Sequence, residues 1–311
     1  GSLKCWGRNY YGELGIGGAV GYGVQYPTPQ TVSFASNQIP KHVVTGFSST
    51  CVILEDGRAM CMGRLSNWFP GVGTTTSFYV LRPEYLARNT YIDVDEVTLG
   101  FDYTCAILDD GSLKCWGRNS YGELGIGGTT GWNVQYTTPQ VVDLGTGRTA
   151  VSVSIGWYHT CAVLDDGSLK CWGYNNYGQL GIGSTTNQNT PQLVNLGTGR
   201  TSESVSLGQF HTCAVLDDDS LKCWGYNYYG QLGIGSTTQQ TTPQTVSFAT
   251  NQIPKSVSSH GYSTCVIFQD SRAMCMGQLG FWFIGSFGTL TETLPEYLGR
   301  NTELSIDEVS T

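Results

Sequence analysis

A short cysteine-containing phrase returns at nearly constant spacing along this chain, and it limits the possible folds more than any other feature. The phrase reads Cys-Trp-Gly or Cys-Met-Gly and begins at Cys5, Cys61, Cys115, Cys171, Cys223 and Cys275. Consecutive copies lie 52 to 56 residues apart. A repeat of this length is one supersecondary unit that buries its apolar face against its neighbours, so the spacing indicates a solenoid or a propeller.

Each repeat unit contains short strand-like runs and no helical pattern. Residues 204–207 and 212–216 are examples, and Gly or Asp turn signals bound them. Glycine, which accounts for 42 of 311 residues, interrupts every stretch that could keep a helical apolar period. Four short strands per unit is the content of one propeller blade. We therefore expect an all-β propeller, with residues 1–311 forming a single domain of six visible units.

A second, longer repeat is superimposed on the repeat of 52 to 56 residues. Residues 31–41 return with one change as residues 245–255, and residues 83–86 return as 295–298. Units one and two thus match units five and six, which gives the order A-B-C-D-A-B. Because this order stops in mid-cycle, we expect the chain to be part of a longer array. The missing piece of the first unit would be one strand and one turn.

Ten of the eleven cysteines form pairs that are ten residues apart. The pairs are Cys51 with Cys61, Cys105 with Cys115, Cys161 with Cys171, Cys213 with Cys223, and Cys265 with Cys275. A three-residue hairpin turn at Asp165-Asp166-Gly167 would place Cys161 directly opposite Cys171, close to disulfide geometry. Nine intervening residues do not fit a zinc site, and reduced thiols are the remaining alternative. Five intra-hairpin disulfides indicate an oxidising, extracellular compartment.

Cys5 has no partner within the sequence at this spacing. Its partner would precede residue 1, so we expect Cys5 to be bridged to a cysteine outside this stretch or in a neighbouring chain. A blade without that strand would present unpaired backbone groups, which are a template for strand addition. Head-to-tail repetition of such a contact would make a filament. The alternative is a free Cys5 on a monomer.

Charge and hydropathy exclude several classes of partner. The chain has 16 basic and 24 acidic residues, a formal net charge of −8, and no Lys/Arg cluster. Binding to a nucleic-acid backbone is therefore not expected. No uncharged apolar run approaches the roughly 20 residues of a membrane helix, so we expect no membrane span.

Residues that could carry chemistry have simpler structural interpretations. His159 and His211 occupy one repeat position that elsewhere holds Ser49, Tyr103 or Ser263, which favours structural hydrogen bonds over catalysis. The acidic turns at residues 109–110, 165–166 and 217–219 lack the ligand spacing of a calcium loop, and residues 178–183 lack the Lys of a phosphate loop. The Trp set, Trp6, Trp116, Trp172 and Trp224, is expected between blades. We predict no catalytic residue, cofactor or metal site, and hence no enzyme.

Two of the glycine positions in the hairpin turns hold other residues, Asp219 and Ser271. Asp tolerates the left-handed conformation better than Ser, so these turns are expected to be strained or differently shaped. Thr-rich loops at residues 74–76, 185–186 and 237–238 are candidate sites of O-linked glycan.

The sequence resembles the regulator of chromosome condensation repeat. The resemblance rests on residues 158–164, on Asp166-Gly167-Ser168-Leu169 and on residues 172–181, and it covers nearly the whole chain. It implies a propeller, typically of seven blades, so we expect six or seven blades here. The founding member is a nuclear guanine-nucleotide exchange factor, an activity that paired cysteines and acidity argue against.

The function expected from the sequence is that of an extracellular structural or adhesive building block or protein-interaction scaffold, which could assemble into a filament or surface array. Its partners would be copies of itself or other extracellular proteins. The alternatives are a secreted inhibitor or lectin-like binding module and, with less support, a nucleotide exchange factor. A fold of this kind does not settle the choice, because function resides in the site.

Overall fold

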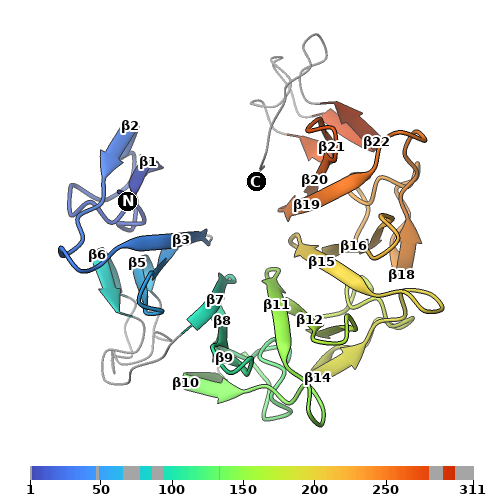
Figure 1. Cartoon of the computed structure of the whole chain (residues 1–311), viewed down its shortest axis with the longest axis horizontal. Coiled ribbons are helices and arrows are strands. Elements are labelled where there is room, and N and C mark those ends of the chain that lie inside the picture. The colour runs from blue at the N-terminus through green and yellow to red at the C-terminus, as the bar shows by residue number, and fades with distance from the viewer. Residues whose placement is uncertain are drawn as a thin grey trace. The chain divides into compact units, whose positions relative to one another are not determined.

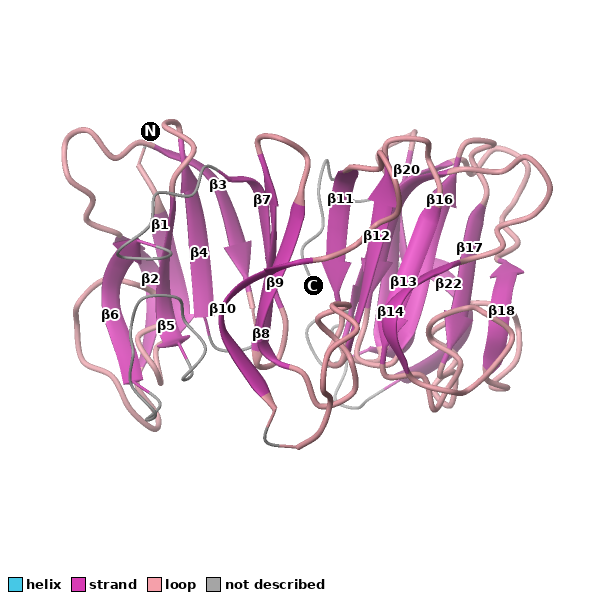
Figure 2. Ribbon diagram, turned by 90° about the horizontal axis from the view of Figure 1, so that it is seen from below, coloured by secondary structure: helices cyan, strands magenta, loops and turns pink. Residues whose placement is uncertain are grey.

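The computed structural model describes residues 2–46, 49–65, 78–85, 94–132, 134–279 and 290–297. All regular secondary structure in these ranges is β-strand, as Figure 2 shows. Within the same ranges, no helix is long and apolar enough to cross a membrane.

The strands form five four-stranded antiparallel sheets and one two-stranded sheet. The two-stranded sheet pairs β1 (Lys4–Arg8) with β2 (Gln25–Thr31). The first two complete sheets are β3 to β6 (Pro40–Thr45, Ser49–Leu54, Ala59–Leu65, Phe78–Tyr85) and β7 to β10 (Val94–Leu99, Tyr103–Leu108, Leu113–Arg118, Gln135–Val141). The others are β11 to β14 (Ala150–Ile155, His159–Leu164, Leu169–Gly173, Gln188–Leu193), β15 to β18 (Ser202–Leu207, His211–Leu216, Leu221–Gly225, Gln240–Thr245) and β19 to β22 (Pro254–His260, Ser263–Phe268, Ala273–Leu279, Leu290–Tyr297). In each complete sheet the strands follow one another in chain order, which is the topology of a propeller blade.

The central hairpin of each blade has the register that the cysteine spacing predicts. In β12 and β13, Cys161 lies opposite Cys171 and Val163 lies opposite Leu169, with residues 165–167 forming the turn. All five pairs are disulfide-bonded, with Cα–Cα distances of 4.0 to 4.1 Å. The predicted disulfide-stapled, all-β propeller is thus confirmed.

The turn of this hairpin requires a left-handed residue at its third position. Gly167 has φ 75°, and Asp219 and Ser271 take the same conformation with φ 61° and 63°. Their main-chain N–H groups close the turn on Leu216 and Phe268 as Gly167 does on Leu164. The two non-glycine turns therefore keep the glycine shape, and the expected strain lies in the backbone conformation of Asp219 and Ser271.

The chain divides into two compact units, residues 1–120 with 129–143 and residues 121–128 with 144–311. In the second unit, β15 packs against β11 and β12, and β19 packs against β15 and β16 (Figure 1). Its core contains disulfides and a tryptophan, with Cys161, Cys171 and Trp224 fully buried. In the first unit β7 packs against β3 and β4, and Trp116 lies in the core there.

The prediction that the four repeat tryptophans all lie in the core is wrong for one of them. Trp116, Trp172 and Trp224 are 2%, 0% and 0% exposed, whereas Trp6 is 59% exposed. Trp172 is covered by Gly125, whose loop closes over the indole. No residue of the described ranges covers Trp6 in this way, so its indole faces solvent.

Candidate functional site

The loops after β9, β13 and β17 each pack on the blade that follows in the chain. In the second unit the main-chain oxygen of Gln179 accepts hydrogen bonds from Trp224 Nε1 at 2.9 Å and from Thr212 Oγ1 at 2.9 Å. A Cβ placed on Gly181 would lie 2.6 Å from Trp224 Nε1, so this position has room only for glycine. The prediction that the glycines of residues 178–183 are turn glycines is confirmed. This loop holds Tyr177 at the edge of its blade.

Aromatic side chains from three successive blades, together with Tyr121 from the loop between β9 and β10, gather at that edge. The set, called the aromatic band from here on, consists of Tyr121, Trp157, Tyr158, Tyr174, Tyr177, Phe210, Tyr226, Tyr228, Tyr229 and Tyr262. All ten lie in the second unit. Neighbouring ring centroids are 4.8 to 6.5 Å apart, and most pairs are edge-to-face or tilted. Such pairs hold one another in place, so the band is a continuous and rigid surface.

Repeat positions explain why the band is continuous. Tyr158, Phe210 and Tyr262 each precede the second strand of a blade, and their centroids follow one another at 6.3 Å and 6.5 Å. Tyr174 and Tyr226 each follow a third strand. Tyr177 lies 5.2 Å from Phe210 and 4.9 Å from Tyr226, so the loop side chains fill the space between the blades.

The rings are half-buried, and their polar ends remain hydrogen-bond donors. Tyr228 is the exception, with 67% of its surface exposed. Burial, followed by the neighbouring tyrosines, raises the pKa of Tyr174 and of Tyr226. Burial likewise raises the pKa of Tyr262, and a hydrogen bond with Gln209 lowers it by less. These phenols therefore stay protonated at neutral pH.

In the two blades that supply Tyr174 and Tyr226, an ion pair of the repeat has been replaced on both sides, whereas the loop of Tyr121 keeps Arg118 and Glu123. The residue after Cys-Trp-Gly is Arg8 in the first unit, and its Nε lies 3.4 Å from Glu13 Oε1. In the blades of the band, Tyr174 stands at the Arg position and Gln179 at the Glu position. Tyr226 and Gln231 repeat this change. Gln179 Oε1 still accepts a hydrogen bond from Tyr177 N at 3.0 Å, so the loop shape is kept while both charges are lost.

The repeat pattern did not predict this surface. Its residues come from five different repeat positions, which only the packing of consecutive blades brings together. The paired replacement of Arg by Tyr and of Glu by Gln is a signal in the sequence that could have indicated it.

Two buried histidines lie between the blades below the band. His159 and His211 are completely buried, and their Nε2 atoms lie 3.0 Å and 2.8 Å from the hydroxyls of Thr212 and Thr264. Burial lowers the pKa of each to about 3. Their role is to tie neighbouring blades together, as their repeat position predicts.

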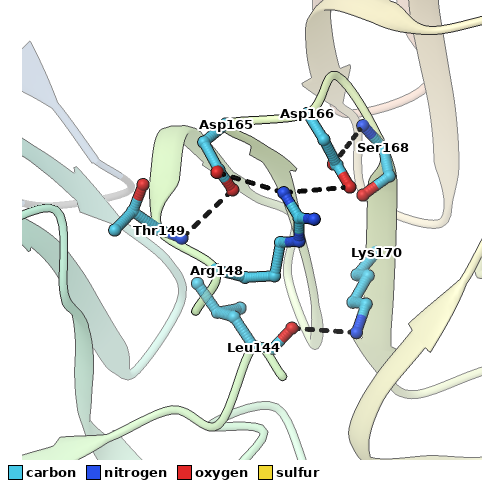
Figure 3. A network of polar contacts seen from close by, with 7 residues as sticks. All are labelled: Leu144, Arg148, Thr149, Asp165, Asp166, Ser168 and Lys170. Carbon is cyan, nitrogen blue, oxygen red and sulfur yellow. Dashed lines mark hydrogen bonds and ion pairs between the residues drawn. The ribbon is translucent and has the colours of Figure 1, made fainter. Parts of the chain in front are cut away.

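The acidic turns lie at the opposite end of the hairpins and form closed polar networks. Figure 3 shows the Arg148 guanidinium between Asp165 and Asp166, at 3.1 Å and 3.3 Å. The amide of Ser168 donates to Asp166, and hydrogen bonds from Ser168 lower the pKa of this carboxyl. Arg200 with residues 217–218 repeats the arrangement in the next blade. The interpretation of these acids as hairpin-turn residues is confirmed, because their oxygens are used within the turns.

Cys5 lies on β1 opposite Gln30 and is half-buried. It forms no disulfide within the described ranges, and burial raises the pKa of its thiol. Its bridge to a cysteine elsewhere stays a prediction. The Thr-rich loop at residues 74–76 and the last residues of the chain lie outside the described residues.

Comparison with known proteins agrees with this architecture. The chain is 29% identical over 276 residues to the ultraviolet-B receptor UVR8 of Arabidopsis thaliana, covering 89% of this chain and 60% of the receptor. It is 28% identical over 250 residues to the human E3 ubiquitin-protein ligase HERC2, covering 79% of this chain and 5% of the ligase. The chain thus spans less than two thirds of either relative.

Solved structures show the same fold. Prp20p of Saccharomyces cerevisiae superposes with a TM-score of 0.82 at 19% identity, covering 100% of this chain and 76% of that protein. Human WBSCR16 superposes with a TM-score of 0.81 at 21% identity, covering 95% of this chain and 78% of that protein. The sequence family described as the RCC1-like domain matches residues 1–299. The chain therefore belongs to the RCC1-like domain family.

Proposed function

We propose that this chain is an extracellular protein-interaction scaffold that binds its partner through the aromatic band. The observation that carries the proposal is the continuity of the band over three blades, with centroid steps of 4.8 to 6.5 Å. Aromatic residues, Tyr and Trp above all, are enriched where protein interfaces gain most of their binding energy. Tyr also offers a large contact area at low entropic cost, as in antibody paratopes.

The five disulfides support the extracellular part of the proposal. All ten bonded cysteines are buried at 0 to 1% exposure, so the bridges belong to the blade cores. Disulfides persist in oxidising compartments and are rare in the cytosol. The proposal includes no catalysis and no nucleotide exchange.

Architecture and assembly form the second part of the proposal. Residues 1–311 would form one propeller domain, and six or seven blades would close the ring; the Cys-Trp-Gly phrase at Cys5, which brings the copies of the repeat phrase to six, supports this. RCC1-like propellers bind proteins, and the binding of Prp20p to Gsp1p and histones has been described for that protein. The proposal also predicts that the protein assembles into a filament or array. It further predicts a disulfide bridge from Cys5 to a neighbouring chain. O-linked glycan at residues 185–186 and 237–238 is a further prediction.

Binding of the labelled protein to the surface and matrix of its source cells tests the proposal. Phe210→Ala removes the ring between Tyr158 and Tyr262, and binding should fall at least tenfold. Leu193→Ser is the matched control, because Leu193 is 64% exposed on β14 and is not part of the band. Equal binding of both variants would contradict the proposal. Loss of binding after removal of cell-surface glycans alone would favour the lectin-like alternative.

A further inference from the structure

We propose that Tyr22 and Tyr228 are sites of oxidative cross-linking, at which a haem peroxidase with hydrogen peroxide joins copies of this chain through a bond between two tyrosine rings. This inference rests on the proposed function and names the covalent bond that would hold a filament or array together. Three observations support it: the exposure of these two rings, the tyrosines that lead to each of them, and their place in the longer repeat.

The two tyrosines differ from the others in exposure. Tyr22 is 96% exposed and Tyr228 is 67% exposed. Every other tyrosine whose side chain the structure describes is buried or half-buried. Coupling joins the ring carbon beside the hydroxyl of one tyrosine to the same carbon of another, so the two ring edges must meet. Of the described tyrosines, these two can therefore best reach a ring of another molecule.

The coupling reaction balances with hydrogen peroxide as the oxidant. Each of two phenols gives up one electron and its hydroxyl proton and becomes a phenoxyl radical. The O–O bond of the peroxide breaks, and the two electrons and two protons convert it to two molecules of water. The radicals then form one carbon–carbon bond, and the hydrogen on each joined carbon moves to the oxygen, which restores both phenols.

Tyrosine rings lead to Tyr228 from within the aromatic band. Tyr174, Tyr177, Tyr226 and Tyr228 follow one another with centroid steps of 6.1, 4.9 and 6.4 Å. Electrons pass readily between aromatic rings at such distances, so a radical formed on an inner ring can move to the next. A phenol that loses an electron must also release its proton, and at the exposed Tyr228 water accepts it. An oxidising equivalent that enters the band is therefore delivered to Tyr228.

Tyr22 has comparable neighbours in the first unit. Its ring centroid lies 6.1 Å from that of Tyr10, and Tyr10 lies 4.3 Å from Tyr11. Both pairs are edge-to-face, with interplanar angles of 87° and 88°. Tyr10 and Tyr11 are half-buried, so the exposed ring again lies at the outer end of a tyrosine cluster.

The longer repeat places both clusters in equivalent units. The phrase Tyr-Tyr-Gly occurs at residues 10–12 of the first unit and 228–230 of the fifth, which are the two copies of one unit type. The other two units that keep the loop have Ser120 and Asn176 at the first position of this phrase. The Tyr-Tyr pair is therefore a feature of one unit type and not of the repeat in general.

The number of sites determines the products. Tyr22 belongs to the first compact unit and Tyr228 to the second, so each unit of the chain carries one site. A molecule with two coupling sites can join two neighbours, and its products can grow without limit. A molecule with one site can form only dimers.

Treatment of the purified protein with a haem peroxidase and hydrogen peroxide tests the inference. After reduction of all disulfides, denaturing electrophoresis should show products larger than dimers, and mass spectrometry should locate the links at residues 22 and 228. Tyr22→Phe alone and Tyr228→Phe alone should each stop the products at dimers. The two substitutions together should lower the yield of linked chains at least tenfold. Tyr136→Phe, at a half-buried position on β10, is the matched control and should change nothing.

A second set of variants separates the ring relay from exposure alone. In the Tyr22→Phe background, Tyr226→Phe keeps the packing of the band but removes the phenol next to Tyr228, and coupling should slow at least threefold. Leu193→Tyr, added to the double phenylalanine variant, creates an exposed tyrosine outside the band. It should couple at least tenfold more slowly than Tyr228 does. If position 193 couples as fast as Tyr228, the tyrosine clusters do not direct the reaction and the inference is wrong.

The cross-linking and the proposed function can fail independently. If peroxidase and peroxide link no chains while Phe210→Ala still abolishes cell-surface binding, the cross-linking sites are wrong and the band remains the binding surface. Links that form mainly at tyrosines other than Tyr22 and Tyr228 would also overturn the inference.

Discussion

The Nε2 atom of His159 lies 3.0 Å from the hydroxyl oxygen of Thr212, which belongs to the next blade. Thr212 donates its own hydrogen to the main-chain oxygen of Gln179 at 2.9 Å, so the hydroxyl must accept the bond from the imidazole. His159 is therefore the neutral tautomer protonated at Nε2. His211 makes the same contact with Thr264, and two neutral imidazoles thus link three consecutive blades.

These histidines predict a loss of stability in mild acid. Burial lowers the pKa of both to about 3, below the ordinary value of 6.5. Between these values the unfolded chain binds more protons than the folded one, so the free energy of unfolding decreases as pH falls from 6.5 towards 3. The expected loss is about 2 kcal/mol per histidine between pH 7 and pH 5. Urea denaturation at the two pH values measures it.

The carboxylates titrate in a lower pH range, and histidine variants serve as controls for the loss of stability between pH 7 and pH 5. The shifted carboxyls, among them Asp166 and Asp218, have a pKa lowered from 3.8, so their contribution is lost only below about pH 4. His159→Ser with His211→Ser, a residue that Ser49 and Ser263 place at the same repeat position, should remove most of the loss between pH 7 and pH 5. The remainder comes from His260, whose pKa is also lowered by burial. His42→Asn, at an exposed position, should leave it unchanged. Constant stability over this range in the unchanged protein would contradict the account.

The hairpin turns predict that one substitution stabilises the protein. Ser271 has φ 63° where other blades have glycine, such as Gly167 with φ 75°. Ser271→Gly should raise the free energy of unfolding by about 1 kcal/mol because it removes the strain of a left-handed residue. Gly167→Ser should have the opposite sign, since a Cβ there would lie 2.6 Å from Thr201 Cβ. Chemical denaturation of both variants measures the two changes in the free energy of unfolding. If Ser271→Gly lowers this free energy, Ser271 is not strained in the turn.

The outer strands are protected against strand addition. On β14, Gln192 Nε2 donates to the main-chain oxygen of Thr190 at 3.1 Å and to its hydroxyl at 3.0 Å, and Pro191 between them has no N–H. The same contacts occur at Gln244 with Thr242 on β18. Because an edge strand with free donors and acceptors is a template for pairing, this Thr-Pro-Gln arrangement closes part of the edge.

Opening that edge should promote self-association. Pro191→Val with Gln192→Ala restores an N–H and uncovers a carbonyl, so oligomers should form at concentrations where the unchanged protein forms none. Light scattering after size-exclusion chromatography measures this, with Leu193→Ser on the same strand as the control. If the double variant keeps the association state of the unchanged protein, the edge is not guarded by these residues.

The polar networks at the opposite end of the hairpins should contribute little stability. Arg148 and its partner Asp165 are 39% and 38% exposed, and exposed ion pairs contribute about 0 to 1 kcal/mol. Arg148→Met should therefore cost less than about 1 kcal/mol, and added salt should reduce the difference. A loss above about 2 kcal/mol would show that the network is structural. The variant should bind the partner as the unchanged protein does.

The repeat spacing was sufficient to predict the blades, the hairpin register and the five disulfides, because all three are local within one unit. The Cys161–Cys171 pair is an example, since a turn of three residues defines it. The aromatic band could not be predicted in this way. Tyr158 and Phe210 hold one repeat position and Tyr177 holds another, and only the packing of one blade on the next brings their rings together. The predicted burial of Trp6 was wrong for the same reason, because burial of this side chain depends on a covering loop and not on its own repeat phrase.

Site-specific photo-cross-linking tests the central claim most directly. Tyr228 is the exposed member of the band at 67%, and Leu193 lies outside it with a similar exposure of 64%. Each is replaced by benzoylphenylalanine, and the protein is irradiated on the surface of its source cells. The account predicts a discrete cross-linked protein from position 228, absent from position 193 and lost when Phe210→Ala is added. Cross-linking of the same protein from position 193, with none from position 228, would contradict it.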